Sequence, residues 1–425
     1  MRHALLLALC LVLPSCSQAP TSSPGVVAVA APAVATAAAS SSPSSGSSWD
    51  ESSSVPREPF TDPEKNFDAA RKALLEGYYR DSITEADLYR AAVAGMLERA
   101  DPALHKWNKL LSPGDVGMLR NDLQGELVGV GVKIDFDPAT GYIDVKGTIP
   151  GSPAEHAGIA PPDKIVTVDG KLYKGLSIHD VVGDIRGKPG ETVTLSILRG
   201  AQLVSVPVVR QKLKYDAVQG MMVAGDVGYV RIPSFNAKTP ATLHDVLTDL
   251  AGKHPRALVL DLRANPGGSF DDSVAAVGEL VPAASTVATV TKRDKVEPIV
   301  AKTTPVMQGL PLAVLVSHET ASSAELVTAA LQELEHATVV GMKTQGKWTV
   351  QTLEDLPNGY AIKYTVGVFA SPSGKSYEGT GLTPDVEVDW TEDAILAAEG
   401  ITDPAKRLAD DLQLRTAVAV LARSK

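Results

Sequence analysis

Residues 312–341 constrain the fold of this chain more than any other stretch. The apolar run 312–316 is short and bounded, as a fully buried strand would be. A polar elbow follows at 317–323, and a second apolar run occupies 338–341. Between them, apolar residues recur at the spacing of one helix face: Val327, Ala330, Leu331 and Leu334. This order predicts a βαβ unit with a right-handed crossover, and therefore an α/β core.

Ser322 lies on the elbow, at the expected N-terminus of this helix. The first N–H groups of a helix have no partner inside the helix and carry partial positive charge. They can bind the oxyanion that forms when a serine hydroxyl attacks a carbonyl. The position therefore suits a nucleophile.

A serine nucleophile needs a base, and Lys347 follows 25 residues later. A lysine accepts a proton only when neutral, so burial would have to lower its pKa. If 347–352 is a strand, Gln351 points to the same face as Lys347 and could orient its amine. The apolar neighbours that could bury the lysine are Val339, Val340 and Val350.

Simpler interpretations of these residues exist. Ser322 and Glu325 also fit the S-x-x-E capping box, in which the serine only caps the helix. A lysine after a glycine is commonly a solvated loop residue. His318 precedes Ser322 by four residues, so a Ser-His pair is a further alternative, although no acid partner is evident.

Two motifs resemble the carboxyl-terminal processing (tail-specific) proteases. T-A-S-S-A-E-L at 320–326 resembles their S-A-S-A-S-E-[IL], and T-Q-G-K-W-T-V-Q at 344–351 resembles T-F-G-K-G-x-V-Q. The resemblance runs from about Phe67 to the C-terminus. It implies a serine endopeptidase that needs no cofactor, with an α/β, crotonase-like core of mixed sheet and flanking helices. It also implies the site residues Ser322 as nucleophile, Lys347 as base and Gln351 as support.

Departures from these motifs keep other functions open. Gln345 and Trp348 replace the family's phenylalanine and second glycine. The indole of Trp348 could shield Lys347 from water, or it could fill the site and abolish activity. A catalytically inactive PDZ scaffold with a protease-like core is the alternative function, and binding of an apolar ligand by such a core is a third.

The oxyanion hole is expected beside a second loop. Residues 228–232 and 257–262 look like buried strands, and the latter leads into L-R-A-N-P-G-G, which matches the family's L-R-x-N-P-G-G. A helix is expected at 271–281. The resemblance implies that the N–H of Gly267 or Gly268, together with that of Ser323, binds the oxyanion. A tight turn without catalytic role is the alternative.

Residues 126–211 resemble a PDZ domain. G-S-P-A-E-H-A-G at 151–158 and P-D-K-I-V-T-V-D-G at 162–170 carry this resemblance. It implies that the loop Val130, Gly131 and Val132 offers N–H groups to a substrate's C-terminal carboxylate, and that the tail adds as a strand. The alternative is a bulged strand. Arg186, after the expected helix 177–185, matches I-R-G-K-P-G and could couple the PDZ domain to the core.

The N-terminus resembles an export signal. A short basic start precedes the apolar run 4–13, which is too short to span a bilayer. The sequence L-P-S-C at 13–16 resembles a bacterial lipobox, which implies lipidation of Cys16 and a location in the cell envelope, facing the periplasm. Secretion with cleavage after Ala19 is the alternative. The following Ala-, Ser- and Pro-rich stretch suits a flexible tether.

Composition excludes several functions. The net charge of −10 argues against nucleic acid or an anionic membrane surface as a main partner. Neither Cys10 nor Cys16 lies in the expected folded region, and no metal-ligand motif is present, so no metal site is predicted. The expected partners are protein substrates with free C-terminal tails, with a second copy of the chain or an activating protein left open. The predicted order is a lipoprotein-type signal peptide at 1–16, a tether at 17–60, a helical segment at 61–125, a PDZ domain at 126–211, a protease core at 212–395 and a C-terminal helical segment at 396–425.

Overall fold

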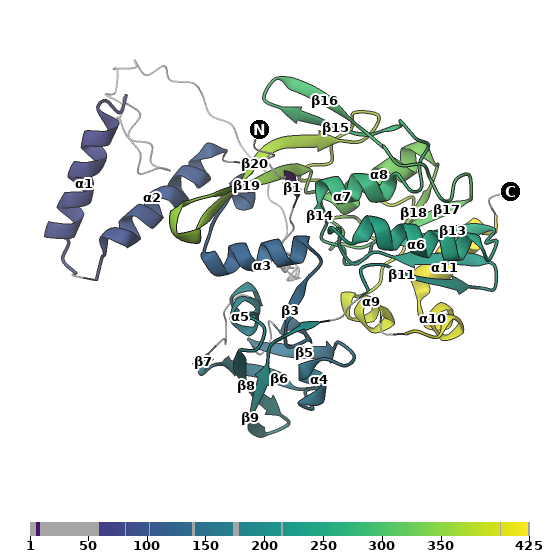
Figure 1. The fold of residues 1–425 in the computed structure, drawn as a ribbon, viewed down its shortest axis with the longest axis horizontal. Coiled ribbons are helices and arrows are strands. Elements are labelled where there is room, and N and C mark those ends of the chain that lie inside the picture. The colour runs from purple at the N-terminus through teal and green to yellow at the C-terminus, as the bar shows by residue number, and fades with distance from the viewer. Residues whose placement is uncertain are drawn as a thin grey trace, which may run out of the picture. The chain divides into compact units, whose positions relative to one another are not determined.

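The computed structural model describes residues 6–8, 59–80, 82–101, 103–137, 141–172, 178–213, 216–399 and 401–423 (Figure 1). The predicted lipid-anchor residue Cys16 and nearly all of the predicted tether lie outside these residues. The chain divides into two compact units, one of residues 14–96 and one of residues 1–13 with 97–425. Within the described residues, no helix is both long and apolar enough to cross a membrane.

The catalytic sheet has the strand order β11-β12-β13-β17-β18-β21. Its strands are β11 (Gln219–Val223), β12 (Val227–Arg231), β13 (Ala257–Asp261), β17 (Leu312–Val316), β18 (Thr338–Gly341) and β21 (Val386–Glu387). All neighbours pair in parallel except β11 and β12, which are antiparallel. The predicted βαβ unit is confirmed as β17, α8 (Ser323–Leu334) and β18. Since β13 pairs directly with β17, the two loops that follow them leave the sheet side by side.

Alternating side chains on these strands fill two cores. Leu260 and Val314 face the layer formed by α6 (Thr239–Ala251), α7 (Phe270–Val277) and α8. Val259 and Leu315 face α11 (Leu412–Leu421), which covers the other side (Figure 1). The sheet is therefore buried on both faces, as parallel sheets are. The helix predicted at 271–281 is shorter, since α7 ends at Val277 and Gly278 is its C-cap.

A second sheet has the order β14-β1-β19-β20-β15-β16, and β2 also pairs with β20. Its members are β1 (Leu6–Ala8), β2 (Lys109–Leu111), β14 (Gly268–Ser269), β15 (Thr286–Lys292), β16 (Lys295–Val300), β19 (Thr349–Asp355) and β20 (Ala361–Ala370). The turn between β19 and β20 contains the short helix η2 (Pro357–Gly359). The strands β14 and β19 each follow a loop that leaves the catalytic sheet. The second sheet therefore lies beside the turn that carries Ser322.

The PDZ sheet has the order β4-β5-β6-β8-β9, with β7 on β6. Its elements are β4 (Val132–Asp137), β5 (Tyr142–Thr148), α4 (Pro153–His156), β6 (Lys164–Val168), β7 (Lys171–Leu172), α5 (Ile178–Ile185), β8 (Thr192–Arg199) and β9 (Gln202–Val209). It encloses its own apolar core. The chain enters through β3 (Leu127–Gly129) and leaves through β10 (Gln211–Leu213), and these two strands pair antiparallel. Because β4 has a neighbour on one side only, it is an edge strand.

The N-terminal helices differ from the single helical segment that was predicted at 61–125. Helix α1 (Pro63–Gly77) has no buried residue, and only Leu97 is buried in α2 (Glu85–Ala100). Met96 on α2 is 64% exposed. The segment also divides, because η1 (His105–Trp107) and α3 (Pro113–Leu123) belong to the larger unit. The helical repeat was visible in the sequence, but the burial of its apolar face depends on partners that the repeat does not specify.

Helices also make up most of the C-terminal segment. They are α9 (Glu392–Glu399), α10 (Pro404–Asp410) and α11. The carboxylates of Asp403 and Asp411 accept hydrogen bonds from the first turns of α10 and α11, which explains where these helices begin. The last helix contacts β13, β17 and β18, so the C-terminal segment is part of the catalytic core's packing.

Candidate active site

Ser322 lies on a strained turn between β17 and α8. Its backbone has φ 55° and ψ −122°, a region that residues other than glycine rarely adopt. Such strain costs about 1–3 kcal/mol and persists where the surroundings fix it, commonly at functional sites. The same kind of elbow presents the nucleophile in other hydrolases. The sequence placed Ser322 at the helix start but did not reveal this conformation.

The Ser322 hydroxyl is free to react. Its Oγ is buried and has no hydrogen-bond partner among the described residues. Ser322 Oγ therefore makes no capping hydrogen bond, although Glu325 supplies the other half of a capping box by accepting from the Ser322 N–H. His318 does not serve it either, because its side chain is exposed and its Nδ1 donates to the Lys343 carbonyl at 2.8 Å. The Ser-His alternative has no support in this geometry.

Glu325 joins Ser322 to the loop that carries Lys347. Its Oε2 accepts hydrogen bonds from the backbone N–H of Ser322 and from that of Lys347, each at 2.9 Å. Its Oε1 accepts from Thr344 Oγ1 at 2.5 Å and from the Gly346 N–H at 2.8 Å. Burial raises the pKa of this carboxyl, against the four donors, which lower it. One buried side chain thus brings the backbones of Ser322 and Lys347 side by side.

The loop 344–347 is also held from its other side by the segment 379–382. The Gly379 N–H donates to the Gly346 carbonyl at 2.8 Å, and the Leu382 N–H donates to Thr344 Oγ1 at 2.7 Å. The backbones approach so closely that a Cβ on Gly381 would lie 2.1 Å from the Thr344 carbonyl oxygen. The segment 379–382 therefore holds the loop that carries Lys347 in place.

Lys347 is fully buried, as a lysine base must be. Its Nζ lies 4.8 Å from the ring centroid of Trp107 in η1. The face of an indole attracts a cationic group, so this contact holds the end of the side chain over the ring. The strand predicted at 347–352 begins only at Thr349, and a bulge falls between Val350 and Gln351. The same-face argument for Lys347 and Gln351 lacks its premise, because Lys347 precedes the strand. The extra residue of the bulge is Val366 on β20, so the bulge leaves the alternation along β19 intact.

Gln351 is buried on β19 and binds its own strand. Its Nε2 donates to Thr349 Oγ1 at 2.5 Å, while its Oε1 has no hydrogen-bond partner among the described residues. A buried amide oxygen without a partner is costly, and at a functional site it marks a place for a ligand or a proton donor. This oxygen is the atom of Gln351 that could accept a hydrogen bond from the lysine amine or from substrate.

The Gly267–Gly268 loop lies against the nucleophile, as the convergence of β13 and β17 predicts. A Cβ on Gly267 would lie 2.9 Å from Ser322 Cβ, so only glycine allows this approach. The Gly267 N–H already donates to Asn265 Oδ1 at 2.8 Å. Of the two glycines that the sequence left open, Gly267 therefore has its N–H engaged, while Gly268 begins β14 and Ser323 begins α8.

The sequence left open that the Trp348 ring shields Lys347 from water or fills the site, and it does neither. Its ring is fully buried in the main core, with centroids 4.7 Å from Phe369 and 5.0 Å from Tyr377. The aromatic ring over the Lys347 amine belongs to Trp107 instead. The principal reason for a catalytically inactive core is thereby weakened, because the bulky side chain packs into the interior.

The PDZ loop at Val130, Gly131 and Val132 is packed closely against the start of α4. Gly131 has φ 82°, and a Cβ there would lie 2.3 Å from Ser152 Cβ. The carbonyls of Val130 and Gly131 accept hydrogen bonds from the N–H groups of Ala154 and Ile149, both at 2.8 Å. Their carbonyls are thus turned into the domain, and Val132 begins the edge strand β4.

Arg186 follows α5 and leaves the PDZ domain. Its Nη1 donates to both carboxylate oxygens of Asp122 on α3, at 3.0 and 2.8 Å. The end of α3 reaches the core in turn, since the Leu123 carbonyl accepts from the Ala237 N–H at 2.9 Å. Arg186 therefore contacts α3 and not the catalytic loops themselves.

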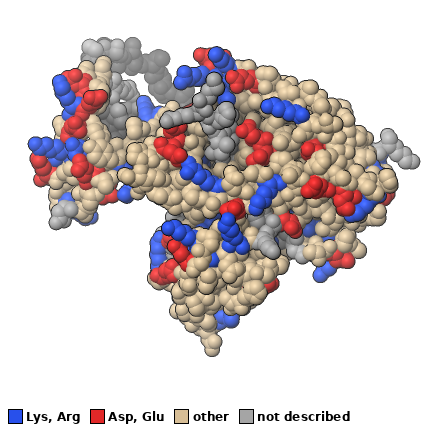
Figure 2. Space-filling model, viewed as in Figure 1, with Lys and Arg blue, Asp and Glu red and all other residues tan. Residues whose placement is uncertain are grey.

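Two functional contacts were missed from the sequence. Glu325 was seen only as a possible cap, although its S-x-x-E spacing placed it beside Ser322. Trp107 lies 240 positions before Lys347, and no local pattern could have joined them. No cluster of metal-ligating side chains occurs among the residues with defined positions. Acidic and basic side chains alternate over the face in Figure 2, without a broad positive patch.

Comparison with known proteins agrees with this geometry. Residues 226–388 match the sequence profile of peptidase family S41, and residues 145–199 match that of PDZ domains. A probable CtpA-like serine protease of Staphylococcus aureus is 32% identical over 348 residues, which span 81% of this chain and 68% of that protein. The corresponding protein of Staphylococcus saprophyticus is 30% identical over 330 residues, or 77% and 66% of the two chains.

Solved structures show the same fold. The photosystem II D1 C-terminal processing protease superposes with a TM-score of 0.52 and 28% identity, over 77% of this chain and 94% of that one. A putative S41 protease from Bacteroides fragilis has a TM-score of 0.55 at 18% identity, over 83% and 96% of the chains, and supports the fold alone. This chain is therefore a serine peptidase of family S41 with a PDZ domain, similar to the CtpA-like and C-terminal processing proteases.

Proposed function

We propose that this peptidase cleaves protein substrates near their C-termini, with Ser322 as nucleophile and Lys347 as general base. The observation that carries the proposal is the shared Glu325 carboxylate, which binds the backbones of both residues. The strained elbow at Ser322 and its unpartnered, buried Oγ support the same assignment.

The reaction follows from these positions. Lys347, once neutral, accepts the Ser322 proton as Oγ attacks the peptide carbonyl. The oxyanion of the tetrahedral intermediate binds the N–H groups of Gly268 and Ser323. Lys347 then returns the proton to the leaving amine, and an acyl-enzyme remains. Water attacks the acyl-enzyme and gives its proton to Lys347, which releases the new C-terminus and restores the serine.

The pH dependence follows from the state of Lys347. Only the neutral amine accepts a proton. Activity therefore rises as pH increases through the titration of this lysine.

The PDZ domain would select the substrates. A free α-carboxylate would bind the loop at Val130, Gly131 and Val132, and the tail would pair with the edge strand β4. A hydrogen bond to a charged group is worth roughly 1.5–3 kcal/mol, or about ten- to a hundredfold in affinity. Arg186 and its ion pair with Asp122 offer a route by which a bound tail could affect the core.

Export and a lipid anchor belong to the same proposal. The apolar run 4–13 and the L-P-S-C sequence suit a lipoprotein of the bacterial cell envelope that faces the periplasm. Membrane fractionation and mass spectrometry of a Cys16→Ser variant test this part separately from catalysis.

The test of the main proposal compares wild type with Ser322→Ala on a partly unfolded protein, with fragments identified by mass spectrometry. Wild type should yield fragments from the C-terminal end of the substrate, and Ser322→Ala should yield none while keeping the wild-type circular dichroism. Activity of Ser322→Ala within tenfold of wild type would refute the assignment of the nucleophile.

A further inference from the structure

A buried cluster of charged side chains lies beneath the oxyanion loop, and the reaction above does not use it. Asp261 ends β13, and Arg263 begins the loop that leads to Gly267 and Gly268. Both side chains are 1% exposed, and Asp411 of the C-terminal segment is fully buried beside them. The cluster joins two parts of the chain that are about 150 residues apart in sequence.

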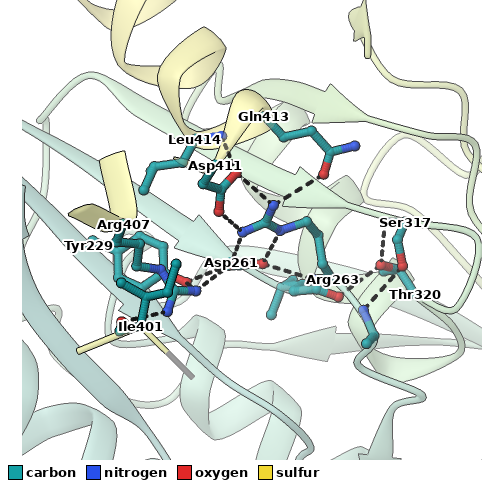
Figure 3. Close-up of polar contacts among 12 residues, drawn as sticks. Tyr229, Asp261, Arg263, Ser317, Thr320, Ile401, Arg407, Asp411, Gln413 and Leu414 are labelled. Atoms are coloured by element: carbon teal, nitrogen blue, oxygen red, sulfur yellow. Dashed lines mark hydrogen bonds and ion pairs between the residues drawn. The ribbon is translucent and has the colours of Figure 1, made fainter. Parts of the chain in front are cut away.

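Arg263 is the centre of the cluster (Figure 3). Its Nε and Nη2 donate to Asp261 at 2.9 and 2.5 Å. Its Nη1 and Nη2 donate to Asp411 at 3.0 and 2.7 Å, and Nη1 also donates to Gln413 Oε1 at 3.2 Å. All five guanidinium N–H groups are thereby engaged, which fixes the plane and direction of the side chain.

Two further residues complete the charge balance. The Tyr229 hydroxyl donates to Asp261 Oδ2 at 2.6 Å and accepts a hydrogen bond from Arg407 of α10. Burial opposes the ionisation of Asp261, but the charge and hydrogen bonds of Arg263 outweigh it and hold the pKa of this carboxyl below its ordinary value. Ion pairs this deep contribute little net stability compared with an apolar core of the same size. Their benefit is a fixed geometry.

That geometry is transmitted to both catalytic loops. The Ala264 N–H donates to Ser317 Oγ at 3.1 Å, and Thr320 Oγ1 donates to the Leu262 carbonyl at 2.8 Å (Figure 3). The Ala321 N–H donates to the Asn265 carbonyl at 3.0 Å, directly before the nucleophile. The residues that flank Arg263 are therefore tied to the elbow that carries Ser322.

We propose that the C-terminal segment completes the active site, with Asp411 acting through Arg263 as a positioning residue for the oxyanion loop. This inference rests on the proposed catalytic role of Ser322 and Gly268. Asp411 does not touch substrate. It binds the Nη1–Nη2 edge of the guanidinium, next to the Nε–Nη2 edge that Asp261 binds, so that the loop cannot turn about the end of β13. Gln413 supports the same guanidinium and donates to the Val388 carbonyl at 2.7 Å.

The test is Asp411→Asn in the full chain, with Asp410→Asn as its matched control. Asparagine still caps α11, where Asp411 Oδ1 accepts from the Leu414 N–H at 2.8 Å, but it removes the charge that faces Arg263. Asp410 is its exposed neighbour and undergoes the same chemical change. With a short peptide substrate, we expect kcat of Asp411→Asn to fall about ten- to a hundredfold while KM changes less than about twofold. The affinity for a peptide aldehyde, which forms a tetrahedral adduct, should fall in parallel with kcat.

A second readout does not depend on catalysis. Hydrogen exchange of the peptide that covers 262–268 should accelerate in Asp411→Asn and remain unchanged in Asp410→Asn, even if Ser322 proves not to be the nucleophile. If Asp411→Asn fails to fold, Gln413→Leu removes one of the five bonds of Arg263 and should lower kcat severalfold in the same pattern. A folded Asp411→Asn with wild-type kcat and wild-type exchange at 262–268 would overturn the proposal. So would a loss of kcat that disappears at lower temperature, which would indicate unfolding alone.

Discussion

The PDZ loop at 130–132 and the oxyanion loop at 265–268 are both proposed to offer backbone N–H groups to an anion. The two loops are held in place in different ways. Each uses a glycine with positive φ whose Cβ would collide with a serine, Gly131 with Ser152 and Gly267 with Ser322. The PDZ loop is held by two backbone hydrogen bonds and a long one from Ser152 Oγ at 3.3 Å. The oxyanion loop is braced by a buried cluster of charges. Binding a carboxylate tolerates small adjustments, whereas catalysis requires donors fixed before the charge develops.

The largest effect should come from Gly268→Ala. A Cβ at this position would lie 2.0 Å from the Phe235 carbonyl oxygen, and its φ of 137° disfavours any side chain. The loop must shift, so kcat/KM should fall about a hundred- to a thousandfold, as when an oxyanion donor is lost. Affinity for a C-terminal peptide should stay the same. The matched control is Gly252→Ala, whose Cβ would only touch Asp249 O at 3.5 Å. Equal activity in both variants would remove Gly268 from the oxyanion hole.

Gly131→Ala should affect binding and spare the chemistry. Its Cβ would displace Ser152 and distort the loop, so affinity for a free C-terminal tail should drop at least about tenfold, which is the expected worth of a charged hydrogen bond. Cleavage of a short amidated peptide should remain within about twofold of wild type on the same argument. Gly129→Ala is the control, because its nearest neighbour would be Arg186 Cγ at an ordinary 3.9 Å. Titration calorimetry measures the affinity of each variant for free and for amidated peptides. If wild type binds both peptides with equal affinity, carboxylate recognition is contradicted.

A smaller effect on cleavage is expected when the ion pair between Arg186 and Asp122 is removed. If the Arg186–Asp122 ion pair carries the effect of a bound tail to the core, Arg186→Ala and Asp122→Asn should each reduce cleavage of tailed substrates about three- to tenfold. The double variant should lose no more than either single one, because both remove the same contact. Cleavage of a tail-less peptide should not change. Additive losses would show that the pair does not act as a unit.

The smallest expected effect is on the stability of the fold at low pH. Arg263 holds the pKa of Asp261 below its unfolded value despite burial, so the ionised carboxylate stabilises the fold at neutral pH. This contribution is lost as pH falls below the unfolded pKa. The free energy of unfolding in urea should therefore fall more for wild type than for Asp261→Asn between about pH 5 and pH 2.5, by about 1–2 kcal/mol. Parallel curves would mean that the cluster does not depend on this charge.

The sequence predicted what depends on local pattern. The bounds of β17 and β18 and the helix between them follow from apolar periodicity, and the elbow follows from their order. The bulge at Val366 of β20, opposite Val350 and Gln351, was not predictable, because it depends on the pairing of the two strands. The ring of Trp107 over Lys347 and the bonds of Asp411 to Arg263 join distant segments, which no single-sequence pattern reports. The exposed faces of α1 and α2 show the same limit, since periodicity identifies an apolar face but not its partner.

The most direct measurement of the central claim is covalent labelling with a fluorophosphonate, followed by mass spectrometry of the modified peptide across a pH series. The account predicts one adduct, on Ser322, whose rate of formation rises with pH. Lys347→Ala should abolish the adduct and His318→Ala should retain it, because only the lysine accepts the serine proton. Labelling of another serine, or wild-type labelling in Lys347→Ala, would contradict the Ser322–Lys347 mechanism.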